Sequence, residues 1–191
     1  MFFLTVPSIK LVPKVYSARW QDISLLAERE ARSDREDVYS TLLAPGDSGN
    51  GTLFSQPVCT EKFSHYLRNP DKGLLMVVWL HKDLPESVNE QEVLAGYLAM
   101  KSFDKQNYIE SLHIWKEYRR NGYGRFLLNK SINLPERFSQ YKRKVTTISV
   151  RESSLGEQLF LKSCGFRCEK ILKDFYDLPV ETAYIFRHRI N

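Results

Sequence analysis

The chain has 191 residues, of which 42% are hydrophobic, so it can form one domain with a sizeable core but not two full ones. Its three cysteines form no Cys-x-x-Cys pair and its four histidines are scattered, which argues against a disulfide scaffold or a zinc site and fits a reducing cytosol. The net charge of +5 is uneven: residues 1–100 hold 10 basic and 13 acidic side chains, whereas residues 101–191 hold 18 and 10, which indicates an anion-binding C-terminal half. We therefore expect a single domain over residues 1–191 without a metal.

The opening residues, Met1 to Pro7, are apolar but lack a basic leader and a small-residue cleavage site, so no signal peptide is expected. No apolar run in the sequence approaches the roughly 20 residues needed to span a bilayer. We therefore expect a cytoplasmic protein with no membrane partner.

Strand-like and helix-like segments alternate along the chain without an internal repeat, a pattern typical of one α/β or α+β domain. β-branched and aromatic residues mark the strands, and apolar residues at helical spacing mark the helices. Strands are expected at residues 11–18, 74–80, 93–102, 108–115, 145–150, 166–176 and 182–189, and helices at 21–32, 60–68, 122–134 and 154–163.

Two local patterns refine the first half of the chain. Thr60 is expected to cap a short helix that stops before Pro70, because the residue before a proline is pushed out of helical geometry. Residues 44–51, Ala-Pro-Gly-Asp-Ser-Gly-Asn-Gly, have the strongest loop composition in the chain and are expected to form a surface loop or a substrate lid.

Residues 119–124, Arg-Arg-Asn-Gly-Tyr-Gly, lie between an expected strand and an expected helix. Two glycines one residue apart allow a tight turn in which successive backbone N–H groups point into one concavity. The positive end of the following helix and two arginines favour an anion there, and a diphosphate suits it best. The run is neither a Gly-x-x-x-x-Gly-Lys-Ser/Thr loop nor a full dinucleotide fingerprint, since Leu127 stands at the third glycine position. The alternative is a tight turn that binds nothing.

The most concentrated basic patch is Lys142, Arg143 and Lys144, which a nucleic-acid-binding protein could use. No helix-turn-helix, zinc-finger or ribonucleoprotein motif accompanies it. A basic turn before a strand is usually just solvated, so nucleic acid is not an expected partner.

Residues 112–124 and the order of elements resemble the GNAT superfamily of acetyl-CoA-dependent N-acetyltransferases. The family signature is an Arg or Gln, two residues, a Gly, one residue, and a Gly or Ala, and Arg119, Gly122 and Gly124 fit it. The resemblance implies a mixed, mostly antiparallel central sheet of about six to seven strands with flanking helices. It also implies acetyl-CoA as co-substrate, with a bulge in the fourth strand that frees backbone groups for the pantetheine arm. The residues implied in binding are Leu112, His113, Ile114, Arg119, Arg120, Asn121, Gly122, Tyr123, Gly124, Arg125 and Ser154.

A second stretch, residues 150–166, looks like the end of the family's fifth strand, its last helix and the closing Gly-Phe. With the paired aromatics Phe175 and Tyr176, it is similar to protein N-terminal acetyltransferases of the ribosomal-protein-alanine type. Three positions depart from the family pattern. Ser149 occupies a position where the protein N-terminal enzymes often have His, and Ser154 one where the family often has Asn. Leu161 occupies the position of a Tyr that protonates the leaving thiolate.

Acetyl transfer to an amine needs a base for the amine, stabilisation of the oxyanion, and a way for the thiolate to leave. Glu110 is the first candidate base. It precedes Leu112 by two residues on the expected strand, and because side chains alternate along a strand, the two should point to the same sheet face. Tyr108 is the second, by similarity to a tyrosine of some protein N-terminal acetyltransferases. Tyr176 could replace the missing acid or gate the substrate. His113 is expected to point away from Leu112 and to be structural.

The leading hypothesis is an N-acetyltransferase that moves acetyl from acetyl-CoA to a primary amine of a small molecule or peptide. The alternative is a non-catalytic GNAT-like domain that binds an acyl-CoA as a sensor or interaction module. The absence of a proton donor at Leu161 favours that alternative.

Overall fold

The computed structural model describes residues 11–32, 56–82, 92–134, 145–177 and 179–190. The expected loop at residues 44–51 and the basic residues 142–144 lie outside these ranges. None of the helices described has the length and apolar character needed to cross a membrane. The elements are β1 (Leu11–Ser17), α1 (Trp20–Arg32), α3 (Gln56–Arg68), β2 (Gly73–Lys82), β3 (Val93–Ser102), β4 (Asn107–Ile114), η1 (Lys116–Tyr118), α4 (Tyr123–Ile132), β5 (Val145–Arg151), α5 (Leu155–Ser163), β6 (Arg167–Asp177) and β7 (Val180–Arg189).

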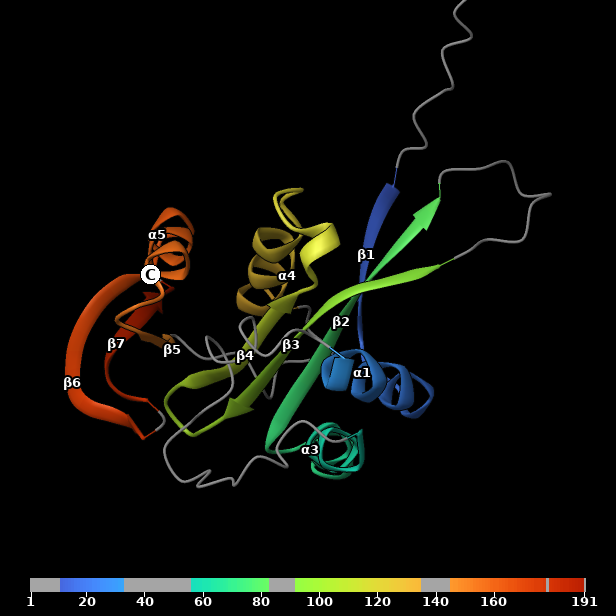
Figure 1. The fold of residues 1–191 in the computed structure, drawn as a ribbon, viewed down its shortest axis with the longest axis horizontal. Coiled ribbons are helices and arrows are strands. Elements are labelled where there is room, and N and C mark those ends of the chain that lie inside the picture. Colours follow the sequence, from blue (N-terminus) through green and yellow to red (C-terminus); the bar gives the residue numbers. More distant parts are fainter. Residues whose placement is uncertain (1–10, 33–55, 83–91, 135–144, 178, 191) are drawn as a thin grey trace, which may run out of the picture.

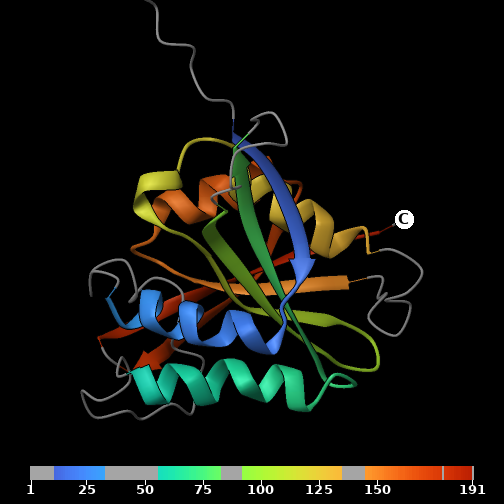
Figure 2. The same ribbon diagram turned by 90° about the vertical axis from the view of Figure 1, so that its right-hand side faces the viewer.

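The strands of the described residues form one seven-stranded sheet in the order β1-β2-β3-β4-β5-β7-β6 (Figure 1). Every neighbouring pair is antiparallel except β4 and β5, which are parallel. Helices α1 and α3 cover one face of the sheet, and α4 and α5 cover the other (Figure 2). This mixed, mostly antiparallel sheet with flanking helices confirms the expected fold class.

Each face of the sheet has its own hydrophobic core. The core beneath α4 and α5 contains Leu98, Leu127 and Leu161, whereas the core beneath α1 and α3 contains Phe63 and Tyr97. Tyr97 and Leu98 are neighbours on β3 that point to opposite faces, because successive strand residues alternate. Burying one Leu or Phe side chain stabilises the fold by roughly 1.5–3 kcal/mol before the cost of conformational entropy is subtracted. Because both cores contain residues of β3, both helical layers are anchored to this strand.

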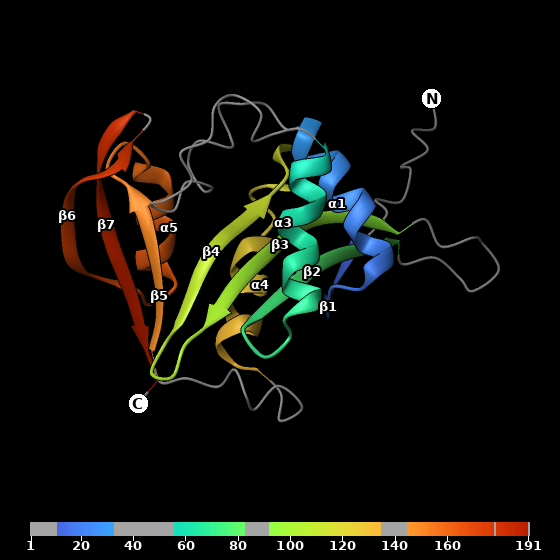
Figure 3. The same cartoon turned by 90° about the horizontal axis from the view of Figure 1, so that it is seen from below.

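The sheet opens between β4 and β5. Their parallel pairing joins only residues 107–109 to residues 146–148. Just beyond it β4 carries a bulge: consecutive residues of β3 pair with Ile109 and Ser111, which leaves Glu110 without a counterpart. Figure 3 shows β4 and β5 diverging from their shared end. The rest of β4 therefore has one edge that β5 does not occupy.

The expected strands and helices are present, and one boundary was wrong by several residues. Helix α3 begins at Gln56 rather than at Thr60, so Thr60 lies inside the helix and does not cap it. Pro57 stands in the first turn, where a proline is tolerated because its missing N–H would have no intrahelical partner. Helix α4 ends at Ile132, two residues earlier than residue 134.

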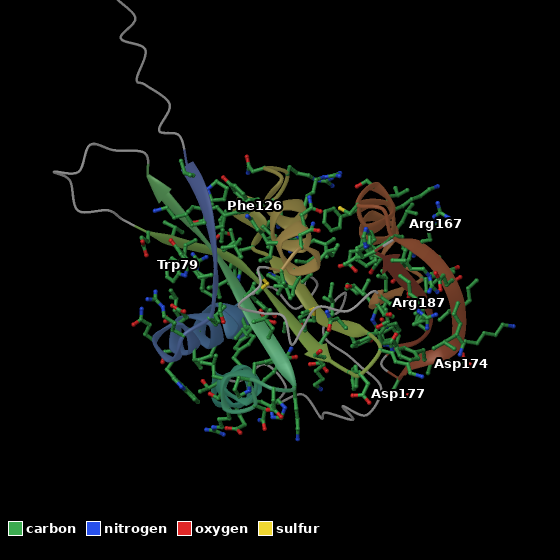
Figure 4. All side chains as sticks on the ribbon, turned by 180° about the vertical axis from the view of Figure 1, so that it is seen from behind. Trp79, Phe126, Arg167, Asp174, Asp177 and Arg187 are labelled. Atoms are coloured by element: carbon green, nitrogen blue, oxygen red, sulfur yellow. The ribbon has the colours of Figure 1, made fainter. Side chains whose placement is uncertain are left out.

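Strands β6 and β7 form a hairpin that holds part of the basic charge of the C-terminal half. Arg167 and Arg187 are paired in the register of the two strands, and Figure 4 labels both on this side of the molecule. Glu169 lies 3.1 Å from Arg187 and 2.7 Å from Arg189, and hydrogen bonds from these two guanidinium groups lower the pKa of its carboxyl to about 2. These charges are used within the hairpin rather than at the glycine-containing loop.

Candidate active site

The loop at residues 119–124 passes twice through the left-handed region of backbone space. Arg120 has a φ of 64° and Gly122 a φ of 81°. Gly122 is also the N-cap of α4, so the N–H groups of the first helical turn, which have no intrahelical partner, begin at this loop. Turns of this kind can direct successive N–H groups to one side, as in the nests that bind anions, and we name residues 120–124 the nest. A non-glycine residue at positive φ costs on the order of 1–3 kcal/mol, a strain that is concentrated at binding sites.

Side-chain hydrogen bonds fix the loop against its neighbours. Arg119 Nε donates to the Ile114 carbonyl at the end of β4, at 2.7 Å, and Asn121 Nδ2 donates to the Arg119 carbonyl at 3.0 Å. Arg125, in the first turn of α4, donates to the carbonyl and to the hydroxyl of Ser163 at the end of α5, both at 2.9 Å. The protein's own residues therefore hold the loop in shape.

The two glycines leave room at the nest. A Cβ at Gly122 would meet nothing within 4 Å, but the positive φ there disfavours any other residue. A Cβ at Gly124 would lie 3.5 Å from Phe160 and 3.6 Å from Ile114, which are ordinary contacts. Alanine therefore fits at Gly124, whereas a branched side chain would crowd these neighbours and the nest.

A cavity of about 460 Å³ joins the loop to the opening between β4 and β5, and it has the size of a small-molecule site. We name it the loop cavity. Apolar residues of both strands and of α5 form its walls. Two residues of the set implied in acetyl-CoA binding do not line it: Asn121 supports the loop, and Ser154 is the N-cap of α5. Those that line it are Leu112, His113, Ile114, Arg119, Arg120, Gly122, Tyr123, Gly124 and Arg125.

Helix α5 brings Leu161 to the wall of the loop cavity. Its side chain is only 2% exposed and belongs to the core beneath α4 and α5. A leucine has no proton to donate. A donor for a leaving thiolate must therefore come from another residue or from water.

Glu110 lies on the opposite sheet face from Leu112, so the expectation that they share a face is wrong. The bulge inserts Glu110 into β4 as an extra residue and shifts the alternation of side chains by one. Leu112 packs against the core beneath α4 and α5, whereas Glu110 bonds Tyr66 of α3. His113 also points to the α1 and α3 face, where its ring stacks on Tyr97, which confirms its predicted direction.

Both carboxylate oxygens of Glu110 have partners. Oε1 lies 2.5 Å from Lys101 Nζ, and Oε2 accepts a hydrogen bond from the Tyr66 hydroxyl. Burial, followed by the nearby Glu110 charge, raises the pKa of Tyr66, so this phenol keeps its proton and acts as a donor. The side chain of Glu110 is 17% exposed and that of Lys101 41%. The carboxylate is thus held from two sides and still reaches solvent.

Tyr108 and Tyr176 meet at Ser149, which lies on β5. The hydroxyl groups of Tyr108 and Ser149 are 2.6 Å apart, and Tyr176 also hydrogen-bonds Ser149. Burial raises the pKa of Tyr108, and it raises the pKa of Tyr176 to about 12 although the hydrogen bond with Ser149 opposes the rise. Both phenols are therefore protonated at neutral pH, which suits a proton donor better than a base.

A buried arginine fixes the ring of Tyr176. Arg151, 3% exposed, places its Cζ 4.1 Å from the centre of that ring, a cation–π contact worth about 2 kcal/mol when desolvated. Its guanidinium also lies 2.9 Å from Glu181 Oε2, and Glu181 Oε1 accepts the N–H of Ser153 at 2.5 Å. Because Tyr176 pairs with Glu181 across the hairpin, these contacts fasten the β6–β7 hairpin to the end of β5.

The ionisable residues themselves are predictable from the sequence, but the residues that hold them, Lys101, Tyr66 and Arg151, are not. Lys101 and Tyr66 come from β3 and α3, and no spacing in the sequence connects them to β4. Arg151 is the last residue of β5, and a charge at the end of a largely buried strand is the only available signal.

Within the described ranges, no three His, Cys, Asp or Glu side chains come together as a group that could hold a metal ion. Cys164 and Cys168 are free thiols. The expectation that the protein works without a metal stays a prediction.

Residues 51–166 match the sequence model of the Acetyltransferase (GNAT) family, which is more than half of the chain, and the chain therefore belongs to this family. The resemblance drawn from the loop and from the last helix is thereby confirmed. No curated protein sequence is significantly similar to the chain.

Several solved structures share the fold. The ribosomal-protein-S18-alanine N-acetyltransferase from Escherichia coli has a TM-score of 0.63 at 15% identity, over 94% of this chain and 95% of that one. The ribosomal-protein-S5-alanine acetyltransferase from Vibrio fischeri has a TM-score of 0.68 at 11% identity, over 93% and 92%. A GNAT family acetyltransferase from Elizabethkingia anophelis with acetyl-CoA bound has a TM-score of 0.56 at 16% identity, over 93% and 98%. At these identities the likeness is one of fold.

Proposed function

We propose that the protein is an N-acetyltransferase that transfers acetyl from acetyl-CoA to a primary amine of a small molecule or peptide by direct attack. The observation that carries the proposal is the opening between β4 and β5. On one face it leads to an anion nest and the loop cavity, and on the other it borders ionisable side chains, Glu110 with Lys101 and Tyr108 with Tyr176. Two substrates can therefore reach one strand from opposite faces.

The loop cavity has the chemistry that coenzyme A requires. The nest and the N-terminus of α4 would hold the pyrophosphate, and Arg120 adds positive charge beside them. The edge of β4 that faces away from β3 offers the backbone groups of residues 112–114 to the amides of the pantetheine arm. Apolar side chains of β4 and β5, such as Ile114 and Val150, suit the aliphatic part of that arm.

Acetyl-CoA supplies the activated thioester, and the amine nitrogen attacks its carbonyl carbon. The C–N bond forms, the C–S bond breaks, and the amine gives up a proton. Glu110 accepts that proton directly or through water, because its carboxylate lies on the α1 and α3 face of β4 and still reaches solvent. Tyr108 is the alternative base, but burial raises its pKa, so very little of this phenol is deprotonated and ready to act as a base at neutral pH.

The leaving thiolate takes its proton from Tyr176 or from water. A phenol with a pKa of about 12 is protonated at neutral pH, and Arg151 keeps its ring in one place. This assignment accounts for Leu161 at the position where the family often has the donor tyrosine.

The test is the release of free thiol from acetyl-CoA in the presence of a panel of small amines and peptides. We expect turnover with a subset of the panel, and an acetylated amine as product by mass spectrometry. Tight binding of CoA without turnover across the panel would contradict this proposal and support a non-catalytic acyl-CoA-binding module.

A further inference from the structure

A second cavity, of about 800 Å³, lies on the α1 and α3 face of the sheet, and we name it the lysine cavity. It is formed by the end of α3, the start of β2 and the turn between β3 and β4. Its volume lies within the range of small-molecule binding sites. No residue lines both this cavity and the loop cavity. The residues that line it are His65, Tyr66, Asn69, Lys72, Gly73 and residues 101–106.

The walls of the lysine cavity carry more positive than negative charge. Lys72, Lys101 and Lys105 contribute three ammonium groups, and Asp104 contributes one carboxylate. Lys101 is engaged by Glu110. In the part of the chain that the structure describes, Lys72 and Lys105 are in no salt bridge, so their charges are available to an anion.

The end of α3, which borders the same cavity, does not cancel this charge. A helix C-terminus carries partial negative charge on its unpaired carbonyl groups. One of them, the His65 carbonyl, accepts a hydrogen bond from Asn69 Nδ2 at 2.9 Å, and just beyond the helix the Asn69 carbonyl accepts from the N–H groups of Lys72 and Gly73 at 3.0 and 3.2 Å. The partial charge of a helix end is roughly half an elementary charge. This is less than the positive charge of the lysines, so the ammonium groups dominate the charge of the cavity.

Lys101 connects the lysine cavity to the candidate base. Its ammonium group is bound to Glu110 Oε1, and Tyr66, which also lines the cavity, donates to Glu110 Oε2. A ligand in the cavity would thus be separated from Glu110 only by the side chains of Lys101 and Tyr66. An anion there would compete with Glu110 for Lys101 and loosen the hold on the carboxylate that must accept a proton.

We propose that the lysine cavity recognises an anionic group, a carboxylate or a phosphate, on the acceptor amine, so that the preferred acceptors are acidic. This inference rests on the proposed acetyl transfer and names its substrate class. Lys72 and Lys105 attract the anion, which also draws the ammonium group of Lys101 away from Glu110. An acidic peptide and a small amine with an acid group share this chemistry.

The test compares matched acceptors that differ only in charge. One arm uses peptides with Glu, Gln or Lys after the N-terminal residue. The other uses the C-terminal amides of glycyl-glutamate and glycyl-glutamine as small amines, so that the glutamine compound carries no carboxylate. We expect kcat/KM to favour the Glu over the Gln acceptor in at least one arm, and the arm identifies the source of the anion. Lys72→Gln and Lys105→Gln should each reduce this preference roughly two- to fivefold, the range expected for one exposed charge pair.

The controls separate the cavity from general surface charge. Lys173→Gln removes an exposed lysine on β6, outside the cavity, and should leave the preference unchanged. Asp104→Asn removes the opposing carboxylate and should raise the preference. Equal kcat/KM for Glu and Gln acceptors in both arms, or a preference that survives in the double lysine variant, would overturn the inference.

A binding measurement distinguishes this inference from the proposed reaction. Calorimetric titration of the CoA-loaded protein with the Glu peptide needs no turnover. We expect binding that weakens at high ionic strength and in the double lysine variant. Such binding without acetylation of any acceptor would contradict the reaction but uphold the acidic ligand. Acetylation without charge preference would uphold the reaction alone.

Discussion

The two faces of the sheet at β4 are built from the chain in different ways. On the α4 and α5 face, the nest and much of the loop cavity come from residues 112–125, one continuous strand, loop and helix start. On the α1 and α3 face, the ionisable groups come from α3, β3, β4, β5 and the hairpin. The first site depends on local backbone conformation, and the second on the packing of the whole fold. Substitutions on the two faces should therefore separate cofactor binding from turnover.

The largest effect is expected at the nest. Gly124→Val would place a branched side chain beside Phe160 and in the path of the anion, so CoA affinity should fall at least about 100-fold, or roughly 2.8 kcal/mol. Gly124→Ala is the matched control and should bind CoA nearly as the native protein does, because its Cβ makes only ordinary contacts. Calorimetric titration with CoA measures both. Native affinity in the valine variant would remove the loop from the site.

The next effect is expected on the other face. Glu110→Gln keeps the shape of the side chain but cannot accept the amine proton, so kcat should fall by on the order of 10² while the dissociation constant of CoA changes little. Tyr66→Phe removes one hydrogen bond to the carboxylate and should cost less. Steady-state kinetics and CoA titration of both variants give the comparison. A parallel loss of CoA affinity would mean that the two faces are not separable at Glu110.

A smaller effect is expected at the hairpin. Tyr176→Phe should lower kcat roughly tenfold, the worth of one donated hydrogen bond in the transition state. Since an acid must be protonated to act, and the pKa of Tyr176 is about 12, its contribution should persist through neutral pH and be lost only as the pH approaches that value. Arg151→Lys keeps the charge but loses the guanidinium that contacts the Tyr176 ring, and should give an intermediate kcat. An unchanged kcat in Tyr176→Phe would move the proton donor to water.

The smallest effect is expected outside both faces. The folded pKa of Glu169 is about 2, below the ordinary 4.5, so its ion pairs stabilise the fold fully above about pH 4.5 and this stabilisation is lost as the pH falls towards 2. In Glu169→Gln, the unfolding temperature should therefore decrease less steeply than in the native protein as the pH is lowered. Neither kcat nor CoA affinity should change. Thermal unfolding between pH 6 and pH 2.5 is the measurement. A steeper fall in the variant would contradict the assignment.

The difference between the faces also explains what the sequence could predict. The glycine run, the helix after it and the closing Gly-Phe are contiguous, so their spacing carries the information that the fold uses. The direction of Glu110 was mispredicted because the bulge, which depends on pairing with β3, reverses the alternation. Lys101 and Arg151 were missed because their partners are distant in sequence. The start of α3 was missed because Thr60 is a good cap by type, whereas the helix already begins at Gln56, with Pro57 in its first turn.

The central claim is that the two substrates meet at β4 from opposite faces, and a crystal structure with acetyl-CoA tests it most directly. We predict the pyrophosphate at the N–H groups of residues 120–125, the pantetheine arm along the free edge of β4, and the thioester between β4 and β5, open towards Glu110. Acetyl-CoA in the lysine cavity, or a thioester shielded from Glu110 by the strand, would contradict the account.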